Sequence, residues 1–331
     1  MRDKKKNKKN RVYVIKGGKV DIETEDIKVD KASKKCAPHL NFDGHCAPTE
    51  VLKELAKAYN KEQEELGNDN RIIIDKKLET LNDRKFRLHL IKQLQDNMSE
   101  TCGESQICWL KQDFIKKMNK AYTTYLKRST YRPTGPANSD VWLNTINLME
   151  VMEQYEELYK DFKFLGAVPL DFDKLDGTDG TPRLPVHGTS IALSNLDYSK
   201  LEEMGKTKFG IIFNLDKHNE PGSHWNGAYI DLDRGLVLFF DSYGTKPPPE
   251  IRKFMRAARR YMINNRKMDD KDITCTYSEK RHQFGNSECG VYSMVFIIRM
   301  LKGDTLEQIN KKILKDETMQ KECRDKYFRD G

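Results

Sequence analysis

Long apolar runs are missing from this 331-residue sequence, which has no stretch of about 18 apolar residues, the length that a membrane-spanning helix requires. The basic N-terminus lacks the apolar segment of a secretory signal, so we predict neither a membrane span nor export. Cysteine is also scarce. The seven are Cys36, Cys46, Cys102, Cys108, Cys275, Cys289 and Cys323. Their odd number and irregular spacing predict free thiols in a reducing compartment.

Negative charge is nearly absent from the first 19 residues, where nine Lys and Arg accompany a single Asp. This segment alone carries +8, the net charge of the whole chain, so the remaining residues are neutral overall. A segment this rich in one charge is typical of a disordered tail. We therefore predict a flexible basic tail over residues 1–35, which is a candidate for binding nucleic acid or for directing nuclear entry.

The first half of the remaining chain has helical periodicity, because its apolar residues recur at helical spacing. Three segments show this pattern: 48–66, 73–95 and 108–126. The following segment, STYRPTGPANSD, contains two prolines and a glycine and is typical of a linker. We therefore predict a helical N-terminal arm domain over residues 36–137 and a second domain over residues 138–331.

The second half mixes helices with short segments rich in β-branched and aromatic residues. A strong amphipathic helix is predicted to start near Asp140, and from Phe162 the apolar period changes. The predicted strands are KFLGAVPLDF, FGIIFNLD, WNGAYIDL, GLVLFFDSYG and DITCTYSE. The other predicted helices are 247–266, an apolar one over 289–301 and a polar one from Thr305. This order of elements predicts an α+β fold.

One cysteine lies at a chemically favourable place. Cys289 separates the glycine-bearing loop HQFGNSE from the first turn of the apolar helix and is followed by Gly290. Free N–H groups at a helix N-terminus favour a thiolate and can hold a developing oxyanion. A cysteine at the head of an apolar helix is, taken alone, more often a buried apolar residue than a nucleophile.

A thiolate nucleophile needs a base, and His224 is the best placed of the seven histidines. It begins the segment HWNGAYIDL, and Asp241 ends the next predicted strand. If these strands are antiparallel neighbours, the aspartate lies beside the imidazole and orients it. Gln283, six residues before Cys289, is a candidate oxyanion donor. Each residue alone is weak evidence, but their order and local settings together fit a Cys-His-Asp site.

Metal binding is the alternative use of cysteine and histidine. Cys36, His39, His45 and Cys46 lie together in CAPHLNFDGHC. Their spacing, in which a histidine directly precedes a cysteine, is unusual for zinc. We expect no metal there, and the chemistry predicted for Cys289 requires no cofactor.

The motifs in the second half resemble those of a known superfamily. They are HW, then an aspartate 17 positions after the histidine in FFDSYG, then Q-x5-CG at the start of a helix. Over roughly residues 138–331 they resemble the ubiquitin-like-protein (SUMO) and adenovirus-type cysteine proteases. The resemblance implies a papain-like, SUMO-protease-type core. It also implies a nucleophile, a base, an orienting residue and an oxyanion donor, which are Cys289, His224, Asp241 and Gln283.

The N-terminal half resembles a narrower group. KKCAPHLNFDGHCAPTEVLKEL, LKQDFIKKMNKAY and YRPTGPANSDVWLNTINL are similar to the helical arm and hinge of the polyprotein-processing proteases of large DNA viruses, with African swine fever virus as the closest resemblance. The swine fever enzyme carries Asn where this chain has Asp241, as the cellular SUMO proteases do. Either side chain can orient an imidazole.

This resemblance implies an endopeptidase that cleaves after Gly-Gly and matures viral core or capsid polyproteins, in the host cytoplasm and the virion. Trp225, next to the base, is expected to cover a channel that admits only glycine. The alternative is that Trp225 is an ordinary core residue. Gly290 is expected to border the substrate. The chain's own Gly17-Gly18 is either a linker pair or a site of self-cleavage.

Two other functions remain open. The same triad serves a protease that removes SUMO or another ubiquitin-like protein from its conjugates. A DNA-tethered structural virion protein with a vestigial triad is the alternative from another class. The presence of all four catalytic residue types favours an enzyme.

Overall fold

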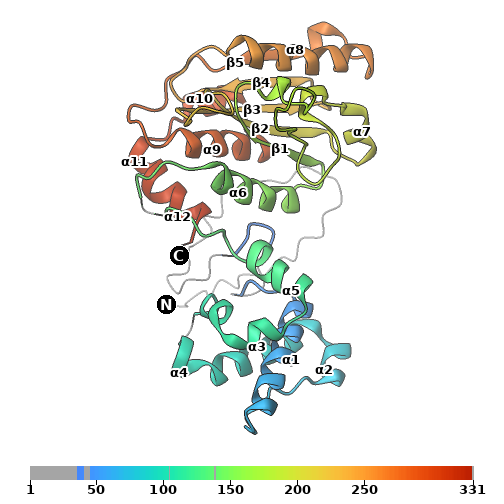
Figure 1. Ribbon diagram of the computed structural model, residues 1–331, viewed down its shortest axis with the longest axis vertical. Helices are drawn as coiled ribbons and strands as arrows, with labels where there is room; N and C mark the ends of the chain where they lie inside the picture. The colour runs from blue at the N-terminus through green and yellow to red at the C-terminus, as the bar shows by residue number, and fades with distance from the viewer. Residues whose placement is uncertain (1–35, 41–44, 104, 138, 330–331) are drawn as a thin grey trace, which may run out of the picture.

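The computed structural model describes residues 36–40, 45–103, 105–137 and 139–329. A small helical body and a larger body built around a β-sheet follow one another along the long axis of the molecule (Figure 1). The predicted α+β fold with a helical N-terminal region is therefore confirmed. The predicted tail over residues 1–35, including Gly17 and Gly18, lies outside the described residues, and the predicted domain boundaries stay predictions.

The small body has one apolar core, to which helix α1 (Thr49–Glu65) contributes a buried face. This helix confirms the prediction for residues 48–66. The segment 73–95 is not one helix but two, α2 (Lys76–Leu81) and α3 (Asp83–Asn97), followed by the short α4 (Ser99–Cys102). The break falls at Asn82, whose backbone is extended and whose side chain accepts a hydrogen bond from the Lys85 N–H at 2.9 Å. A residue that caps the next helix cannot continue the previous one.

The prediction of one helix over residues 108–126 is also wrong. Two 3₁₀ segments, Cys108–Lys111 and Asp113–Lys117, precede α5 (Lys120–Tyr125) and a π-turn at Leu126–Thr130. The backbone of Gln112 is extended between the 3₁₀ segments, and Asn119 caps α5 by accepting a hydrogen bond from the Ala121 N–H at 2.9 Å. Their apolar side chains still reach the core, because short segments also bury one face.

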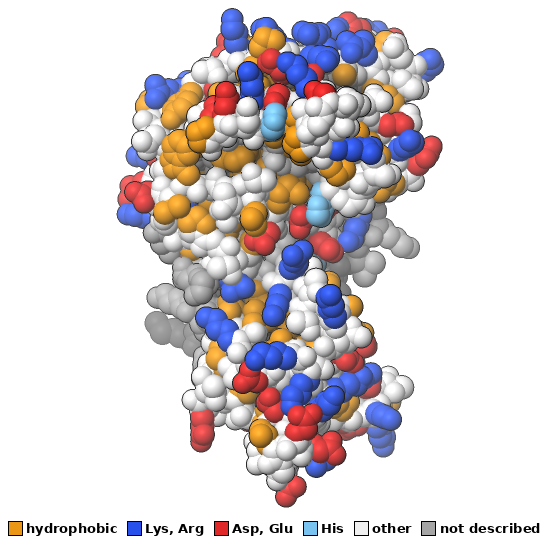
Figure 2. Space-filling view, in the orientation of Figure 1, with side chains coloured by type: hydrophobic (Ala, Val, Ile, Leu, Met, Phe, Trp, Pro, Cys, Tyr) orange, Lys and Arg blue, Asp and Glu red, His pale blue; other side chains and the backbone are white. Residues whose placement is uncertain are grey.

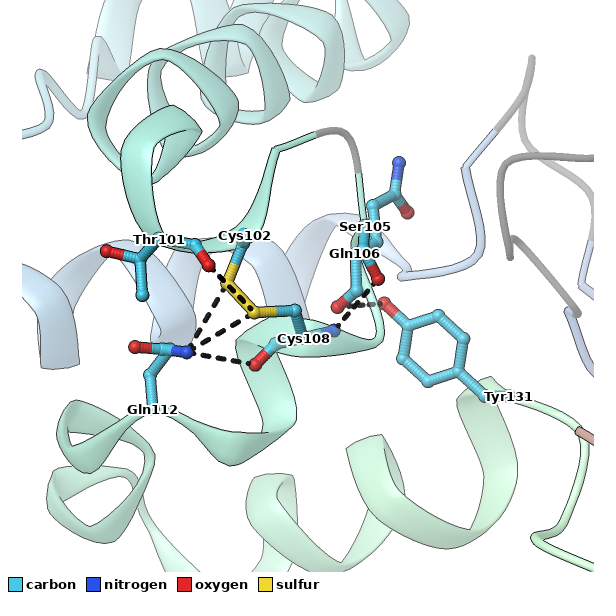
Figure 3. The surroundings of a disulfide bond; sticks show 7 residues. All are labelled: Thr101, Cys102, Ser105, Gln106, Cys108, Gln112 and Tyr131. Carbon is cyan, nitrogen blue, oxygen red and sulfur yellow. Dashed lines mark hydrogen bonds between the residues drawn. A yellow bond between two sulfur atoms is a disulfide. The ribbon is translucent and has the colours of Figure 1, made fainter. Parts of the chain in front are cut away.

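Four cysteines of the small body form two disulfides, Cys36–Cys46 and Cys102–Cys108. The prediction that all seven cysteines are free thiols is wrong for these four; Cys275, Cys289 and Cys323 are free. Figure 3 shows the second disulfide beside Gln112, whose amide donates toward both sulfurs at 3.3 and 3.4 Å. Sequence spacing did not reveal the pairing, because each bridge depends on how the surrounding turns bring two cysteines together.

A five-stranded mixed sheet forms the centre of the large body, in the order β1-β2-β3-β4-β5. The strands are β1 (Phe162–Val168), β2 (Lys208–Asn214), β3 (Trp225–Asp231), β4 (Leu236–Phe240) and β5 (Thr274–Tyr277). β3 is antiparallel to β2 and β4, whereas the outer pairs β1–β2 and β4–β5 are parallel. All five predicted strands are present, and β3 is buried along its whole length.

Helices cover both faces of the sheet, which explains the burial of β3 (Figure 1). One face packs against α6 (Thr145–Leu158), α9 (Cys289–Leu301) and the C-terminal helices. The other packs against α7 (Tyr198–Glu203) and α8 (Pro249–Asn264). The C-terminal helices are α10 (Leu306–Lys311), α11 (Asp316–Thr318) and α12 (Arg324–Tyr327), with a π-turn at Met319–Cys323. Among the described helices, none is long and apolar enough to cross a membrane.

Helix α6 begins five residues after the predicted start near Asp140. Asn144 forms a capping box with Asn147, in which each side chain accepts a hydrogen bond from the other's backbone N–H, at 2.9 and 3.1 Å. This cap fixes the first turn at Thr145 and leaves residues 139–143 without regular secondary structure. This segment runs past the N-terminus of α9, where it becomes part of the candidate site.

Positive charge is not confined to the N-terminal tail. Figure 2 shows Lys and Arg side chains gathered at the top of the view, over α8. The outward face of that helix carries Arg252, Lys253, Arg256 and Arg260, all exposed. The neutral total of the chain after residue 19 therefore hides a basic surface on one side of the sheet.

Candidate active site

The predicted nucleophile lies at the N-terminus of a completely surrounded helix. Cys289 is the first residue of α9, in which every residue except Arg299 is buried. The second turn of α9 crosses β3 at Gly227, where an added Cβ would lie 3.2 Å from the Ser293 carbonyl oxygen. Glycine suits this close approach, because an added Cβ would make a contact tighter than usual, and the crossing brings Cys289 next to the beginning of β3. The thiol is therefore held where unpaired helical N–H groups favour negative charge.

His224 and Asp241 lie side by side, as predicted from two antiparallel neighbouring strands. His224 directly precedes β3, Asp241 directly follows β4, and Gly227 of β3 pairs with Phe240 of β4. The His224 Nε2 atom lies 2.6 Å from the Asp241 Oδ1 atom. The Cys289 thiol lies close enough to the imidazole to raise the pKa of His224. Because Asp241 occupies Nε2, the other ring nitrogen, Nδ1, is the one left for the thiol.

The surroundings of this pair favour a charged imidazolium. Burial lowers the pKa of His224. The interactions with Asp241 and Cys289 outweigh this effect and raise the pKa to about 9. Burial likewise raises the pKa of Asp241, but hydrogen bonds from His224 and Thr245 outweigh it, so this pKa is lower than usual. The site can therefore hold a proton on His224 and a negative charge on Asp241 at neutral pH.

A tight turn after β4 fixes the Asp241 carboxylate. Its oxygens accept hydrogen bonds from the Tyr243 N–H at 3.1 Å, from the Thr245 N–H at 3.2 Å and from the Thr245 hydroxyl. The Tyr243 ring stacks on the His224 ring, with 4.7 Å between the centroids and 16° between the planes. The imidazole is thus held at one edge by a carboxylate and on one face by an aromatic ring.

Gln283 is joined to the same turn from the loop before α9. The Ser242 hydroxyl donates a hydrogen bond to Gln283 Oε1 at 2.7 Å, and Gln283 Nε2 donates to the Gly285 carbonyl at 3.2 Å. The backbone N–H of Gln283 donates to the Ser242 carbonyl at 2.9 Å. These contacts use one of the two amide hydrogens of Gln283, and its role as an oxyanion donor stays a prediction. The structure therefore joins His224, Asp241 and Gln283 through hydrogen bonds and the turn after β4, and Cys289 lies close to the His224 imidazole.

Trp225 and Gly290 meet on the other side of Cys289. Trp225 is 7% exposed, and its indole N–H donates to the Leu143 carbonyl at 2.9 Å. A Cβ on Gly290 would lie 3.2 Å from Leu143 Cβ and 3.3 Å from Trp225 Cδ1. Both residues therefore have a packing role, and their contact with substrate stays a prediction. Trp142, the neighbour of Leu143, is 46% exposed and had not been selected from the sequence as a site residue.

A buried ion pair fixes the residue before the nucleophile. Arg324 of α12 is fully buried, and its guanidinium contacts both carboxylate oxygens of Glu288 at 2.8 and 3.0 Å. The same guanidinium donates to the carbonyls of Ser287 at 3.1 Å and Val141 at 2.7 Å. Arg324 therefore joins the loop before α9 to the segment before α6.

The two cysteines of the segment 36–46 are not free to bind a metal. The disulfide joins Cys36 to Cys46, which leaves neither as a thiolate ligand. Within the described part of the chain, no group of three or more His, Cys, Asp or Glu side chains is arranged to hold a metal ion.

Comparison with known proteins identifies the family. A protein named as a thiol protease, from Acanthamoeba polyphaga mimivirus, is 32% identical over 289 residues, which cover 86% of this chain and 89% of that protein. The model of the C-terminal catalytic domain of the Ulp1 protease family matches residues 210–330. The chain belongs to the Ulp1 protease family. It is therefore a member of a cysteine protease family, as its motifs predicted, and the matched range contains all four predicted residues.

More distant Ulp1-family relatives cover the N-terminal body as well. A protein of African swine fever virus named as a SUMO-1 cysteine protease is 22% identical over 308 residues, which cover 89% of this chain and 95% of that protein. The crystal structure of a protease from African swine fever virus aligns with a TM-score of 0.53 and 20% identity, over 90% of this chain and 96% of that one. The two chains share a fold that includes the helical N-terminal region.

Several residues of the site were not predicted from the sequence. Tyr243, Ser242 and Thr245 follow Asp241 in a D-S-Y-G-T turn, and an Asp whose side chain accepts from an N–H two residues later is a recognisable turn pattern. That signal was available in the sequence. Arg324 lies 36 residues from Glu288, and no local pattern relates residues so far apart.

Proposed function

We propose that this chain is a cysteine endopeptidase that cleaves after Gly-Gly, and that its substrates are viral structural polyproteins processed in the host cytoplasm and the virion. The observation that carries the proposal is the position of His224, which is hydrogen-bonded to Asp241 and lies close enough to Cys289 for the thiol to raise its pKa. Cys289 lies at a helix N-terminus and His224 retains its proton at neutral pH, an arrangement that suits a thiolate nucleophile.

The proposed reaction follows from these positions. The Cys289 thiolate attacks the carbonyl carbon after Gly-Gly, and the backbone N–H of Cys289 with the Gln283 amide stabilises the oxyanion. His224 gives its Nδ1 proton to the leaving amine, which departs and leaves an acyl-enzyme. His224 then removes a proton from water, and the resulting hydroxide releases the acyl group and restores Cys289. Asp241 keeps the imidazole oriented through both steps.

The preference for Gly-Gly is supported by the crowded surroundings of Cys289. The indole of Trp225 and the side chain of Leu143 lie against Gly290, the residue after the nucleophile. A substrate strand that enters beside them has little room for side chains. Trp142 extends from the same segment and is exposed, so it is available to cover such a strand.

The first test compares the parent protein with Cys289→Ala on a series of Gly-Gly-X peptides. We expect cleavage after the second glycine by the parent and none by the variant, because alanine cannot form the acyl-enzyme. Circular dichroism and the thermal midpoint of unfolding should match between the two, since the change removes only one sulfur atom. Cleavage by Cys289→Ala at the parent rate would contradict the proposed nucleophile.

Removal of a SUMO-type modifier is the second candidate, because some swine fever virus relatives carry the name SUMO-1 cysteine protease. A SUMO–fluorophore conjugate, assayed beside the peptides, separates the two functions. Cleavage of the conjugate but of no short peptide would favour the deconjugating protease. Inactivity of the parent on both substrates would favour the structural protein with a vestigial triad.

A further inference from the structure

An exposed aromatic residue stands directly beside the candidate oxyanion donor. Phe284 follows Gln283 and is 72% exposed. It is nevertheless firmly positioned, because the backbone N–H groups of Phe284 and Gly285 both donate to Asp316 Oδ2, at 2.9 and 2.7 Å. The other oxygen of Asp316 accepts a hydrogen bond from the Tyr292 hydroxyl of α9 at 2.9 Å. The ring is thus presented to solvent by a loop that is attached to the helix of the nucleophile.

Arg281 connects this ring to the catalytic histidine. Its guanidinium carbon lies 5.0 Å from the centroid of the Phe284 ring and 5.3 Å from that of Tyr243, whose ring stacks on His224. Its Nε donates to the Gln283 carbonyl at 2.8 Å, which leaves the terminal nitrogens unused. Within the part of the chain that the structure describes, no carboxylate forms an ion pair with Arg281. An exposed guanidinium held between two rings is preorganised to bind a carboxylate.

The chemistry of the proposed reaction determines which part of a substrate meets this row of side chains. His224 must deliver its proton to the leaving nitrogen, so the residues after the scissile bond lie on the His224 side of Cys289. Tyr243 covers a face of that imidazole, and Arg281 and Phe284 lie beyond it. The row Tyr243–Arg281–Phe284 is therefore on the path of the leaving segment.

We propose that Tyr243, Arg281 and Phe284 form a subsite that binds an acidic side chain within the first three residues after the scissile bond; this rests on the proposed function. The centroid steps of 4.7 and 5.3 Å place Arg281 at most about 10 Å from the His224 ring, the span of about three residues of extended chain. The neighbouring charges fit an acidic partner. Lys246 is exposed, and the Asp316 carboxylate is occupied by backbone N–H groups and Tyr292.

The test uses peptides with Gly-Gly fixed and with Asp, Asn or Lys at each of the three following positions. For the parent, we expect kcat/KM to be about tenfold higher with Asp than with Lys at one of these positions, with the difference mainly in KM and smaller at high salt. Arg281→Ala should bring the Asp/Lys ratio of kcat/KM close to one. Arg281→Glu should invert the ratio.

The matched control is Lys280→Glu, which reverses an exposed charge one residue away from Arg281. It should keep the Asp preference of the parent, because Lys280 is not held between the two rings. A structural role of Arg281 would instead lower kcat/KM for all peptides in parallel and leave the ratio unchanged, and this outcome would overturn the subsite. Equal cleavage of Asp and Lys peptides by the parent would overturn it as well. No cleavage of any peptide would instead contradict the proposed function, and the subsite with it.

Discussion

The hydrogen bond between His224 and Asp241 is the largest of the effects that raise the pKa of His224. The Asp241 carboxylate is buried, yet it stays negative because the turn after β4 supplies hydrogen bonds from Tyr243 and Thr245. This negative charge, together with Cys289, raises the pKa of His224 to about 9 against the opposing effect of burial. The imidazolium therefore persists through neutral pH and is lost as the pH rises through about 9.

We expect Asp241→Asn to move the alkaline limb of the kcat/KM profile to lower pH. Asparagine removes the negative charge that raises the pKa of His224, while the burial that lowers this pKa remains. Profiles of Gly-Gly peptide cleavage from about pH 6 to 10 measure the shift. Asp171→Asn is the matched control, because Asp171 pairs with His218 at a similar distance of 2.7 Å. An unchanged alkaline limb in Asp241→Asn would show that the carboxylate does not control the titrating group.

His224 and Asp241 also make the stability of the fold depend on pH, in opposite directions. Since the pKa of His224 is higher in the folded protein than its usual value, its protonation stabilises the fold fully below about pH 6.5. This contribution is lost as the pH rises through about 9. The carboxylate has the opposite dependence, because its lowered pKa contributes stability that disappears in acid.

At the scale of elements, the packing of α9 on β3 sets the distance between thiol and imidazole. Cys289 begins the helix and His224 precedes the strand, and Gly227 is the point where the two elements touch. A side chain at Gly227 would press against the Ser293 carbonyl and the Phe296 ring. Since backbone cannot turn aside as a side chain can, the helix itself must move.

We expect Gly227→Val to lower kcat/KM by at least tenfold and to lower the free energy of unfolding by about 1–3 kcal/mol. The control is Gly210→Ala on β2, which meets Ile297 of the same helix, two turns beyond Cys289. Gly210→Ala should destabilise the protein without a comparable loss of activity among folded molecules. Urea denaturation and active-site titration measure the two quantities. Similar activity losses per unit of stability in both variants would argue against a positioning effect of Gly227.

The elements that the sequence predicted correctly are those whose pattern is local. All five strands, α1, α8 and α9 have an apolar period that their own residues determine. The single helix predicted over residues 73–95 was wrong because Asn82, a polar residue in a helical pattern, caps its successor. The single helix predicted over residues 108–126 was wrong for a similar reason, because an apolar period does not distinguish one α-helix from consecutive 3₁₀ turns.

The residues of the candidate site likewise fall into those that the sequence predicted and those that it did not. Cys289, His224 and Asp241 were selected because each lies at the end of a predictable element. The side chains that hold them in place, such as Asp316 and Arg324, are far away in the sequence and were not foreseen. The two disulfides could not be predicted from the sequence, because each depends on how the folded turns bring two cysteines together.

At the scale of the whole molecule, Arg324 connects segments that are distant in sequence. Its guanidinium contacts Glu288 before α9 and the carbonyl of Val141 before α6. Arg329, five residues later, donates from its backbone to the Pro133 carbonyl at 3.0 Å. The C-terminal segment thus fastens the chain between the two bodies to the loop that carries the nucleophile.

We expect Arg324→Ala to lower the free energy of unfolding by about 3–5 kcal/mol, because it leaves the Glu288 carboxylate buried without its partner. Arg324→Met combined with Glu288→Gln should recover a large part of the loss, since no uncompensated charge remains. Urea denaturation measures both. The control is Lys321→Ala, which removes an exposed ion pair with Glu317 and should have no measurable effect. Equal stability of Arg324→Ala and the parent would contradict a structural role of the ion pair.

The buried ion pair also bears on how the protein is made. A ribosome delivers residues in order, so Glu288 and Cys289 leave it well before Arg324, which follows Glu288 after 36 residues. Until then the carboxylate beside the thiol has no cation, and the loop before α9 lacks its attachment to the segment before α6. The nucleophile is thus synthesised before the residue that secures its loop, so a nascent chain does not acquire its finished catalytic geometry before residue 324 has been added.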